Sequence, residues 1–194
     1  MELAYLTNLL IFEKKISKGR SGGEVLMNKR SIKILVLLLL VGLFVYFGVA
    51  LANRGKFVDV GDKAYDFQME DLKGKTIKLS DYKGQVVAVN YFATWCNPCV
   101  EEAPDLEAFD KEYGDTYKLL IIDRGETRDR VNKFVKKNKT TSTYLMDFDN
   151  KVSKAYNVVA QPETFIIDKK GVIREHYIGP ISKEDLYGLV SKYE

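Results

Sequence analysis

The chain holds two cysteines, Cys96 and Cys99, which follow Trp95 and are separated by two residues. The apolar run Val86–Phe92 precedes them and predicts a buried strand, and the pattern after them predicts a helix. Because the free N–H groups and the dipole at a helix N-terminus stabilise a thiolate, Cys96 is expected to be the attacking thiol. Cys99, one turn further on, is expected to resolve the mixed disulfide. The pattern therefore predicts dithiol–disulfide exchange.

Two other roles for the cysteine pair are less well supported. A purely structural Cys96–Cys99 disulfide would close so small a loop that it would remove little entropy from the unfolded chain. A zinc site needs four ligands, usually Cys or His, whereas the chain has two cysteines and one histidine, His176. No motif surrounds His176, which is expected to be an exposed strand residue. We therefore expect no metal and no other cofactor.

The composition indicates one folded domain and an anchor. The chain has 194 residues, of which 46% are hydrophobic, enough for one core of ordinary size. Its net charge is +3, and the positive excess lies within residues 1–52. Since the remainder is close to neutral, nothing suggests nucleic acid as a partner. Cysteines confined to one motif fit an exported redox protein, although a cytosolic thioredoxin would carry the same pair.

Residues 34–52 form an uncharged, almost wholly apolar run, close to the roughly 20 residues that a helix needs to cross a bilayer. Lys29, Arg30 and Lys33 stand just before it. By the positive-inside tendency, residues 27–33 form a basic flank in the cytoplasm and the rest of the chain is exported. The run therefore predicts a single-pass protein of the cell membrane whose catalytic domain lies on the extracytoplasmic side.

A cleaved signal peptide is the alternative, because Ala50-Leu51-Ala52 resembles a cleavage site and cleavage would give a secreted protein. The length of the apolar run favours an uncleaved signal-anchor, followed by a linker at 53–60. Residues 1–26 carry no pattern that belongs to a fold. Gly22-Gly23-Glu24 can be encoded by a ribosome-binding sequence, so we expect translation to start at Met27. The extension 1–26 is then untranslated, or else unstructured.

Residues 61–194, called the head below, alternate strand and helix patterns and predict a central mixed sheet with helices on both faces. A small hairpin that includes Thr76–Leu79 opens the head, and the helix after the cysteines ends at Gly114 and contains Pro104, which should kink it. The other expected elements are a strand at Tyr117–Asp123, a helix around Val131–Val135, a strand at Thr143–Met146, a short helix at Val152–Tyr156, a hairpin of Thr164–Ile167 with Val172–Tyr177, and a closing helix at Leu186–Tyr193.

Four motifs of the head, taken together, match one known group. They are Gly61-Asp62-Lys63-Ala64-Tyr65-Asp66-Phe67, Leu79-Ser80-Asp81-Tyr82-Lys83-Gly84, Val89-Asn90-Tyr91-Phe92-Ala93-Thr94-Trp95-Cys96-Asn97-Pro98-Cys99 with Glu102 and Pro104, and Gln161-Pro162-Glu163-Thr164-Phe165-Ile166-Ile167-Asp168 with Gly171. With them the head resembles the membrane-anchored thiol-disulfide oxidoreductases of the TlpA/ResA type, part of the thioredoxin-like, AhpC/TSA-related superfamily that includes the peroxiredoxins. The resemblance implies an α/β thioredoxin-like fold with an N-terminal β-hairpin extension.

The resemblance also implies roles for single residues. Pro162 matches a cis-proline that lies beside the two sulfurs and shapes a substrate groove, so Trp95, Pro98, Gln161 and Pro162 are the expected substrate-binding residues. Glu102 matches an acidic residue that tunes cysteine ionisation and proton transfer, and it joins Cys96 and Cys99 as an expected catalytic residue.

Four positions also enter the interpretation. Asn90 stands where thioredoxins carry a buried aspartate, which strengthens the case for Glu102. Glu101 is expected to be a plain surface charge. Two departures, Gln161 and Glu163, bear on substrate preference, and Glu163 is expected to add negative charge near the groove.

The function expected from the motif and the resemblance is that of an extracytoplasmic thiol-disulfide oxidoreductase, a monomer that cycles between a Cys96–Cys99 disulfide and the dithiol. The expected role is a reductase of exported protein disulfides, such as apocytochrome c during cytochrome c maturation, or a related role in spore-envelope maturation. A membrane thiol-disulfide protein would donate the electrons. The alternatives are a thiol peroxidase of the peroxiredoxin type, with antioxidant activity, and a redox-silent peptide-binding module.

Overall fold

The computed structural model describes residues 29–52 and 57–194, and the chain divides into two units, Met1–Arg54 and Gly55–Glu194. Each unit is described here by itself. The predicted extension at residues 1–26 and the start at Met27 lie outside the described residues, as does half of the linker 53–60. These features of the N-terminal region therefore stay predictions.

Helix α2 (Lys29–Ala52) contains the whole apolar run at residues 34–52, and its segment Ile32–Val49 is long and apolar enough to cross a membrane. Its 24 residues, at about 1.5 Å each, exceed the roughly 30 Å thickness of a hydrocarbon core. The large apolar side chains described on α2 are exposed. A helix with apolar residues on all its faces fits a lipid environment better than water.

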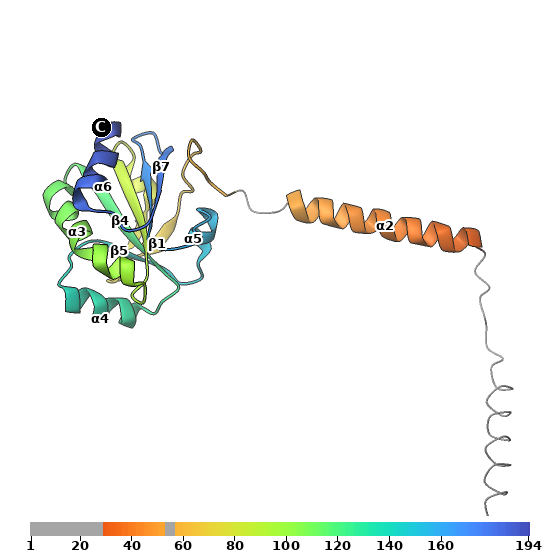
Figure 1. Cartoon of the computed structure of the whole chain (residues 1–194), viewed down its shortest axis with the longest axis horizontal. Helices are drawn as coiled ribbons and strands as arrows, with labels where there is room; N and C mark the ends of the chain where they lie inside the picture. The colour runs from red at the N-terminus through yellow and green to blue at the C-terminus, as the bar shows by residue number, and fades with distance from the viewer. Residues whose placement is uncertain (1–28, 53–56) are drawn as a thin grey trace, which may run out of the picture. The chain divides into compact units, whose positions relative to one another are not determined.

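The head is built on a five-stranded sheet with the order β5-β4-β3-β6-β7 (Figure 1). β3 (Val86–Phe92), β4 (Tyr117–Arg124) and β5 (Tyr144–Asp147) are parallel to one another. β6 (Glu163–Ile167) runs antiparallel to β3, and β7 (Ile173–Ile178) antiparallel to β6. The predicted mixed sheet is confirmed, with strand ends within one residue of the expected positions.

Strand β3 is the centre of the sheet because all of its residues are buried, as the near-continuous apolar run predicts. Successive side chains point to opposite faces, so β3 supplies apolar residues to two separate cores. Its carboxyl end leads directly into the loop that carries Cys96. Because β4 is parallel to β3 with Phe92 opposite Asp123, the carboxyl ends of both strands meet at this loop.

Helices α3 (Asn97–Tyr113), α4 (Arg128–Asn138) and α6 (Lys183–Val190) pack over one face of the sheet and form the first core. The buried side chains that these helices contribute to this core include Leu106, Phe109, Val131, Phe134, Leu186 and Val190. Pro104 lies inside α3, which continues to Tyr113, so the proline does not end the helix.

The opposite face is covered by the N-terminal hairpin, β1 (Gln68–Glu70) paired with β2 (Thr76–Lys78), by the 3-10 helix η1 (Leu79–Tyr82) and by α5 (Lys151–Ala155). This second core is rich in aromatic rings, and Tyr91, Tyr156 and Phe165 contact one another near its centre. The 3-10 helix η2 (Ser191–Tyr193) follows α6. Elements cover both faces of the sheet, as predicted, and the rigid sheet holds the cysteine loop at one edge.

Candidate active site

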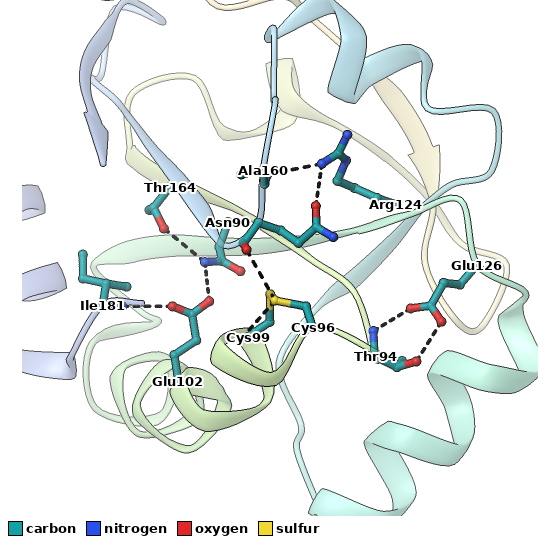
Figure 2. Close-up of a disulfide and its surroundings, with 11 residues drawn as sticks. Asn90, Thr94, Cys96, Cys99, Glu102, Arg124, Glu126, Ala160, Thr164 and Ile181 are labelled. Atoms are coloured by element: carbon teal, nitrogen blue, oxygen red, sulfur yellow. Dashed lines mark hydrogen bonds between the residues drawn. A yellow bond between two sulfur atoms is a disulfide. The ribbon is translucent and has the colours of Figure 1, made fainter. Parts of the chain in front are cut away.

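Cys96 and Cys99 are joined by a disulfide at the N-terminus of α3 (Figure 2). Cys96 is the N-cap residue, and its Sγ accepts a hydrogen bond from the backbone N–H of Cys99 at 3.2 Å. The two cysteines differ in access, because Cys96 is 6% exposed and Cys99 is 0% exposed. A thiolate at Cys96 would therefore gain the stabilisation of a helix N-terminus and would meet a substrate first.

The loop before β6 lies against the disulfide. The backbone carbonyl oxygen of Gln161 is 3.5 Å from the Sγ of Cys96, and the Gln161–Pro162 peptide bond is cis, as the resemblance implies. An open groove beside the disulfide is lined by Trp95, Cys96, Pro98, Arg124, Val159 and Gln161, among others. Trp95, Pro98 and Gln161, which the sequence indicates for substrate binding, thus lie together, whereas Pro162 is buried behind them.

Glu102 lies one helical turn beyond Cys99 and is 3% exposed. Its Oε1 accepts a hydrogen bond from the Asn90 side-chain amide, and its Oε2 accepts one from the backbone N–H of Ile181, both at 2.9 Å. Burial raises the pKa of Glu102 to about 7, although the hydrogen bonds from Asn90 and Ile181 oppose the shift. Glu102 can therefore exist in both protonation states near neutral pH.

Asn90 connects Glu102 to the strand that follows the cis-proline. Its Nδ2 donates to Glu102 and also to the Thr164 hydroxyl at 3.1 Å, but its buried Oδ1 has no partner among the described residues. A protonated Glu102 could donate to this oxygen after a small rearrangement, because a carboxylic acid carries one O–H donor. The pair is suited to hold either the charged or the neutral form of Glu102.

A second acidic group holds the loop between β3 and the disulfide. The Glu126 carboxylate accepts hydrogen bonds from the backbone N–H of Thr94 at 2.6 Å and from its hydroxyl at 2.7 Å. Burial acts to raise the pKa of Glu126, but the hydrogen bonds from Thr94 outweigh it and hold the pKa below its ordinary value. Glu126 thereby fixes the residue two positions before Cys96 (Figure 2).

Asp123 lies fully buried beside Glu126, whose backbone N–H donates to its Oδ2 at 3.0 Å. Burial and the neighbouring Glu126 carboxylate raise the pKa of Asp123. Because two ionised carboxylates in one buried pocket repel each other, the pair holds a proton on Asp123 while Glu126 stays ionised. The cysteine loop therefore rests on one charged and one neutral carboxyl group.

Arg124 holds the loop on the other side of the groove. Its guanidinium donates to the Gln161 side-chain oxygen at 2.6 Å and to the backbone oxygen of Ala160 at 3.2 Å (Figure 2). It also donates to the backbone oxygen of Val158 at 3.2 Å. Sequence reasoning missed both Arg124 and Glu126. The available signal was their position just after the apolar part of a strand parallel to β3, where the carboxyl ends of neighbouring strands meet.

Two sequence predictions near the groove need correction. Glu163 does not face the groove, because its fully buried carboxylate accepts hydrogen bonds from the backbone N–H groups of Val159 at 3.0 Å and Ala160 at 2.7 Å. His176 is half-buried rather than exposed, and its Nε2 lies 2.8 Å from Glu163 Oε2. The reason is sheet pairing, which places His176 opposite Phe165, with the two rings stacked.

The arrangement can carry out thiol chemistry with controlled proton transfer. It combines an accessible sulfur, a buried second sulfur, a buried acid that titrates near neutral pH, and a groove whose backbone lies next to the reactive sulfur. Within residues 29–52 and 57–194, no cluster of three or more His, Cys, Asp or Glu side chains could hold a metal ion. The geometry thus offers redox chemistry through sulfur.

Comparisons with known proteins agree with this chemistry. Residues 60–176 match the AhpC/TSA family. The chain is 36% identical over 160 residues to the thiol-disulfide oxidoreductase ResA of Geobacillus kaustophilus, covering 81% of this chain and 90% of the relative. Among solved structures it is similar to StoA from Bacillus subtilis, at 28% identity and TM-score 0.59 over 64% of this chain and 96% of StoA. The exposed lipoprotein thioredoxin Etrx1 from Streptococcus pneumoniae matches at 29% identity and TM-score 0.61, over 66% of this chain and 99% of Etrx1.

Proposed function

Because the chain belongs to the AhpC/TSA family, and within it to the ResA-like thiol-disulfide oxidoreductases, we propose that it reduces disulfides in exported proteins. Thiol-disulfide oxidoreduction follows from the family and the cysteine pair, whereas the direction of electron flow and the substrate are the proposal. The observation that carries it is the disulfide at the start of α3, which places Cys96 in a groove beside the cis-proline loop with buried acids around it.

The reaction runs in two exchange steps. In the reduced protein, the Cys96 thiolate attacks one sulfur of a substrate disulfide, and the other substrate sulfur leaves as a thiolate with the electron pair of the broken bond. The Cys99 thiolate then attacks Cys96 and releases the second substrate sulfur. The substrate gains two electrons, and the cysteine pair becomes the disulfide that the structure holds. A membrane thiol-disulfide donor would restore the dithiol.

Glu102 is suited to manage the proton of the second step. Cys99 must lose a proton before it attacks, and Cys99 is fully buried, so water has poor access to it. Glu102 lies one turn away and, with its pKa raised by burial to about 7, can accept that proton and later release it. This assigns Glu102 to proton transfer and leaves nucleophilic attack to Cys96 and resolution to Cys99.

The acidic groups around the disulfide favour a reductase over an oxidant. A thiolate at Cys96 is stabilised by the helix N-terminus but opposed by any negative charge on Glu102 or Glu126. Neutral thiols release electrons more readily to a substrate than a strongly stabilised thiolate does, so the reduction potential should lie at the low end for this fold, about −270 mV rather than about −120 mV.

Equilibration of the Cys96–Cys99 pair with dithiol buffers tests the direction. A reduction potential near about −270 mV supports the reductase, and one near about −120 mV indicates a disulfide-forming oxidant. Cys96→Ser should abolish exchange with a test disulfide, and Cys99→Ser should trap a mixed disulfide on Cys96. Unchanged exchange by Cys96→Ser would refute the proposed chemistry.

Apocytochrome c is the substrate that the resemblance to the TlpA/ResA group implies. Its haem-attachment segment, Cys-x-x-Cys-His, must be reduced before haem can be joined to the sulfurs. The test compares an oxidised Cys-x-x-Cys-His peptide with an insulin disulfide as substrates of the reduced protein. Faster reduction of the haem-site peptide supports a role in cytochrome c maturation, and equal rates point to a general reductase of exported proteins.

The protein is membrane-anchored or secreted, as its apolar N-terminal helix and its relatives indicate. The finer proposal is an uncleaved signal-anchor with the head on the extracytoplasmic side, supported by Lys29, Arg30 and Lys33 before the span. A monomer with a peptide groove needs no other subunit for the proposed chemistry. Adding protease to intact cells should cleave the head if it lies outside.

A further inference from the structure

Arg124 lies beside the disulfide, and the exchange reaction gives it no task. Among the residues that line the groove, Arg124 is the one that carries a charge. It is half-buried, so its charge is less shielded by water than that of a fully exposed arginine. A cation in an otherwise neutral groove attracts negative groups of whatever enters the groove.

The contacts of Arg124 hold its guanidinium in place without neutralising it. Its Nη1 donates to the side-chain oxygen of Gln161 and to the carbonyl of Ala160, and its Nη2 donates to the carbonyl of Val158. All three acceptors are neutral. Within residues 57–194, no ion pair joins Arg124 to a carboxylate. One Nη2–H remains for a further acceptor, because each terminal nitrogen carries two hydrogens.

The buried carboxylates near the groove accept hydrogen bonds from groups other than Arg124. Glu163 accepts from the backbone N–H groups of Val159 and Ala160 and lies against His176. Asp147 accepts from the backbone N–H and the hydroxyl of Ser153, among other contacts. Both are buried, so neither can move up into the groove to pair with the guanidinium without giving up these bonds.

The position of Arg124 relative to the reactive sulfur limits which part of a substrate it can meet. Gln161 touches Cys96 Sγ through its backbone oxygen at 3.5 Å and Arg124 through its side chain at 2.6 Å. A substrate cysteine at Cys96 therefore places its neighbouring residues, about 3.3–3.6 Å apart along an extended chain, within reach of the guanidinium. Trp95 and Val159, 62% and 76% exposed, offer apolar contact beside it.

We infer that Arg124 and Gln161 form a specificity subsite that favours protein substrates with an Asp or Glu next to the reactive cysteine. The inference rests on the proposed exchange function and names its substrate class. An arginine that is already oriented by neutral acceptors loses little freedom when it binds a carboxylate, and its remaining Nη2–H can donate one charge-assisted hydrogen bond to a carboxylate oxygen. Lysine-flanked cysteines would be disfavoured by repulsion from the same charge.

The test uses the reduced full chain in a non-ionic detergent and three short peptides with a single cysteine flanked by Glu, Gln or Lys. Each peptide carries its cysteine as a mixed disulfide with 2-thiopyridine. Cys96 attacks the peptide sulfur, the S–S bond breaks, and 2-thiopyridine leaves with the electron pair and absorbs light. Cys99 then displaces the peptide thiol. Each rate is divided by that of 2-mercaptoethanol with the same peptide, which removes differences in intrinsic reactivity.

We expect the second-order rate constant of 2-thiopyridine release, measured in a single turnover, to favour the Glu peptide over the Lys peptide by about fivefold at low salt, and the preference to shrink as salt rises. Arg124→Gln should bring the ratio close to one, and Arg124→Lys should keep part of it. Gln161→Glu should also abolish the preference, because the new carboxylate would pair with Arg124. As a matched control, Arg174→Gln removes the same charge at a site bound to Asp168, outside the groove, and should leave the ratio unchanged.

Each outcome decides one question. If Arg124→Gln slows all three peptides equally and the Glu-to-Lys ratio stays as in the wild type, Arg124 only supports the loop and the inference is wrong. A ratio of one in the wild type overturns it as well. Bis(2-pyridyl) disulfide, small and uncharged, separates this failure from that of the proposed function. A protein that reduces it but shows no peptide preference keeps the exchange function and loses the subsite.

Discussion

Glu102 is a buried acid whose protonation state affects both the stability of the fold and the proposed proton transfer. It is almost fully buried, and its two oxygens accept hydrogen bonds from Asn90 and Ile181, yet no cation is paired with it within the described chain. Burial therefore outweighs the hydrogen bonds and raises its pKa to about 7. A group with a raised pKa favours the folded state while it is protonated, and this contribution is lost as the pH rises through the folded-state value.

Replacing Glu102 with glutamine should remove this pH dependence. The Glu102 carboxyl loses its proton near pH 4.5 in the unfolded chain and near pH 7 in the folded chain. Between these pH values the unfolding free energy of the wild type should therefore fall by about 3 kcal/mol relative to that of Glu102→Gln. Urea unfolding of the disulfide form at several pH values measures it, because no thiol titrates in that form. Glu101→Gln, at an exposed neighbour on the same helix, should show no such change. If the difference in unfolding free energy between the wild type and Glu102→Gln did not change with pH, the raised pKa would be contradicted.

Glu126 is the residue that sets the position of the cysteine loop, through two hydrogen bonds to Thr94. Glu126→Gln removes a negative charge near Cys96 and one of its two oxygen acceptors. We expect the pH profile of Cys96 alkylation to move to lower pH by about 0.3–1 unit, because a thiolate is less opposed there. Iodoacetamide labelling of the reduced protein measures it, in a Cys99→Ser background. A purely structural role would lower the rate at all pH values without moving the profile.

At the scale of elements, the active site depends on loops that are tied to the rigid sheet and helices by buried carboxylates. Glu163 on β6 binds the backbone at Val159 and Ala160, and Glu107 on α3 binds the segment that leads into β5. Backbone N–H groups buried in a loop need acceptors, and a carboxylate supplies several at once. These side chains let irregular segments hold a fixed shape next to the sulfurs.

The Glu107 cluster gives a stability test at this scale. Its carboxylate accepts hydrogen bonds from Thr140, Thr141 and Ser142. Burial acts to raise its pKa, but these hydrogen bonds lower it far below the ordinary value. Glu107→Ala should therefore cost about 2–4 kcal/mol of unfolding free energy at pH 7, since several buried donors lose their acceptor.

The pH dependence of the Glu107 effect follows from the sign of the shift. A lowered folded-state pKa gives stability that is present above the unfolded value of 4.5 and is lost as the pH falls. The difference between wild type and Glu107→Ala should therefore shrink below about pH 4.5 in denaturant titrations. Glu112→Ala, at an exposed position of the same helix with a surface ion pair to Lys183, should cost much less unfolding free energy than Glu107→Ala, because solvent screens exposed ion pairs. Equal losses of unfolding free energy for Glu107→Ala and Glu112→Ala would contradict the role given to the Glu107 cluster.

At the scale of the whole molecule, the chain combines an apolar helix with a head that has its own two cores. The full chain should sediment with membranes and be released only by detergent, because α2 is long enough to span a bilayer. A chain that starts at Asn53 should stay in solution. The double substitution Leu38→Arg and Leu39→Arg, at about 3 kcal/mol each, should weaken membrane insertion. Recovery of a soluble full-length chain would contradict the anchor, and a secreted chain that lacks residues up to Ala52 would indicate cleavage.

The sequence by itself determined the fold class, the order of strands and helices along the chain, and the reactive pair of cysteines. Periodicity is a local property, so Val86–Phe92 predicts a buried strand and the residues after Cys96 predict a helix without knowledge of the rest. The spacing of Cys96 and Cys99 fixes that both sulfurs lie at one helix end. The cis bond before Pro162 was also predicted, but from the resemblance, since no local pattern specifies it.

Only the tertiary structure decided which distant charges meet at this site. Glu126 reaches Thr94 because β4 lies beside β3, and Arg124 reaches Gln161 because β6, which follows Gln161, pairs with the other side of β3. Strand pairing thus brings together residues that are far apart in sequence. The pairing of β6 with β7 brings Glu163 to His176, where sequence reasoning expected a charge near the groove and an exposed histidine. Burial and hydrogen bonding together decide how Glu126 ionises, and both depend on every element packed around it, which a single sequence does not display.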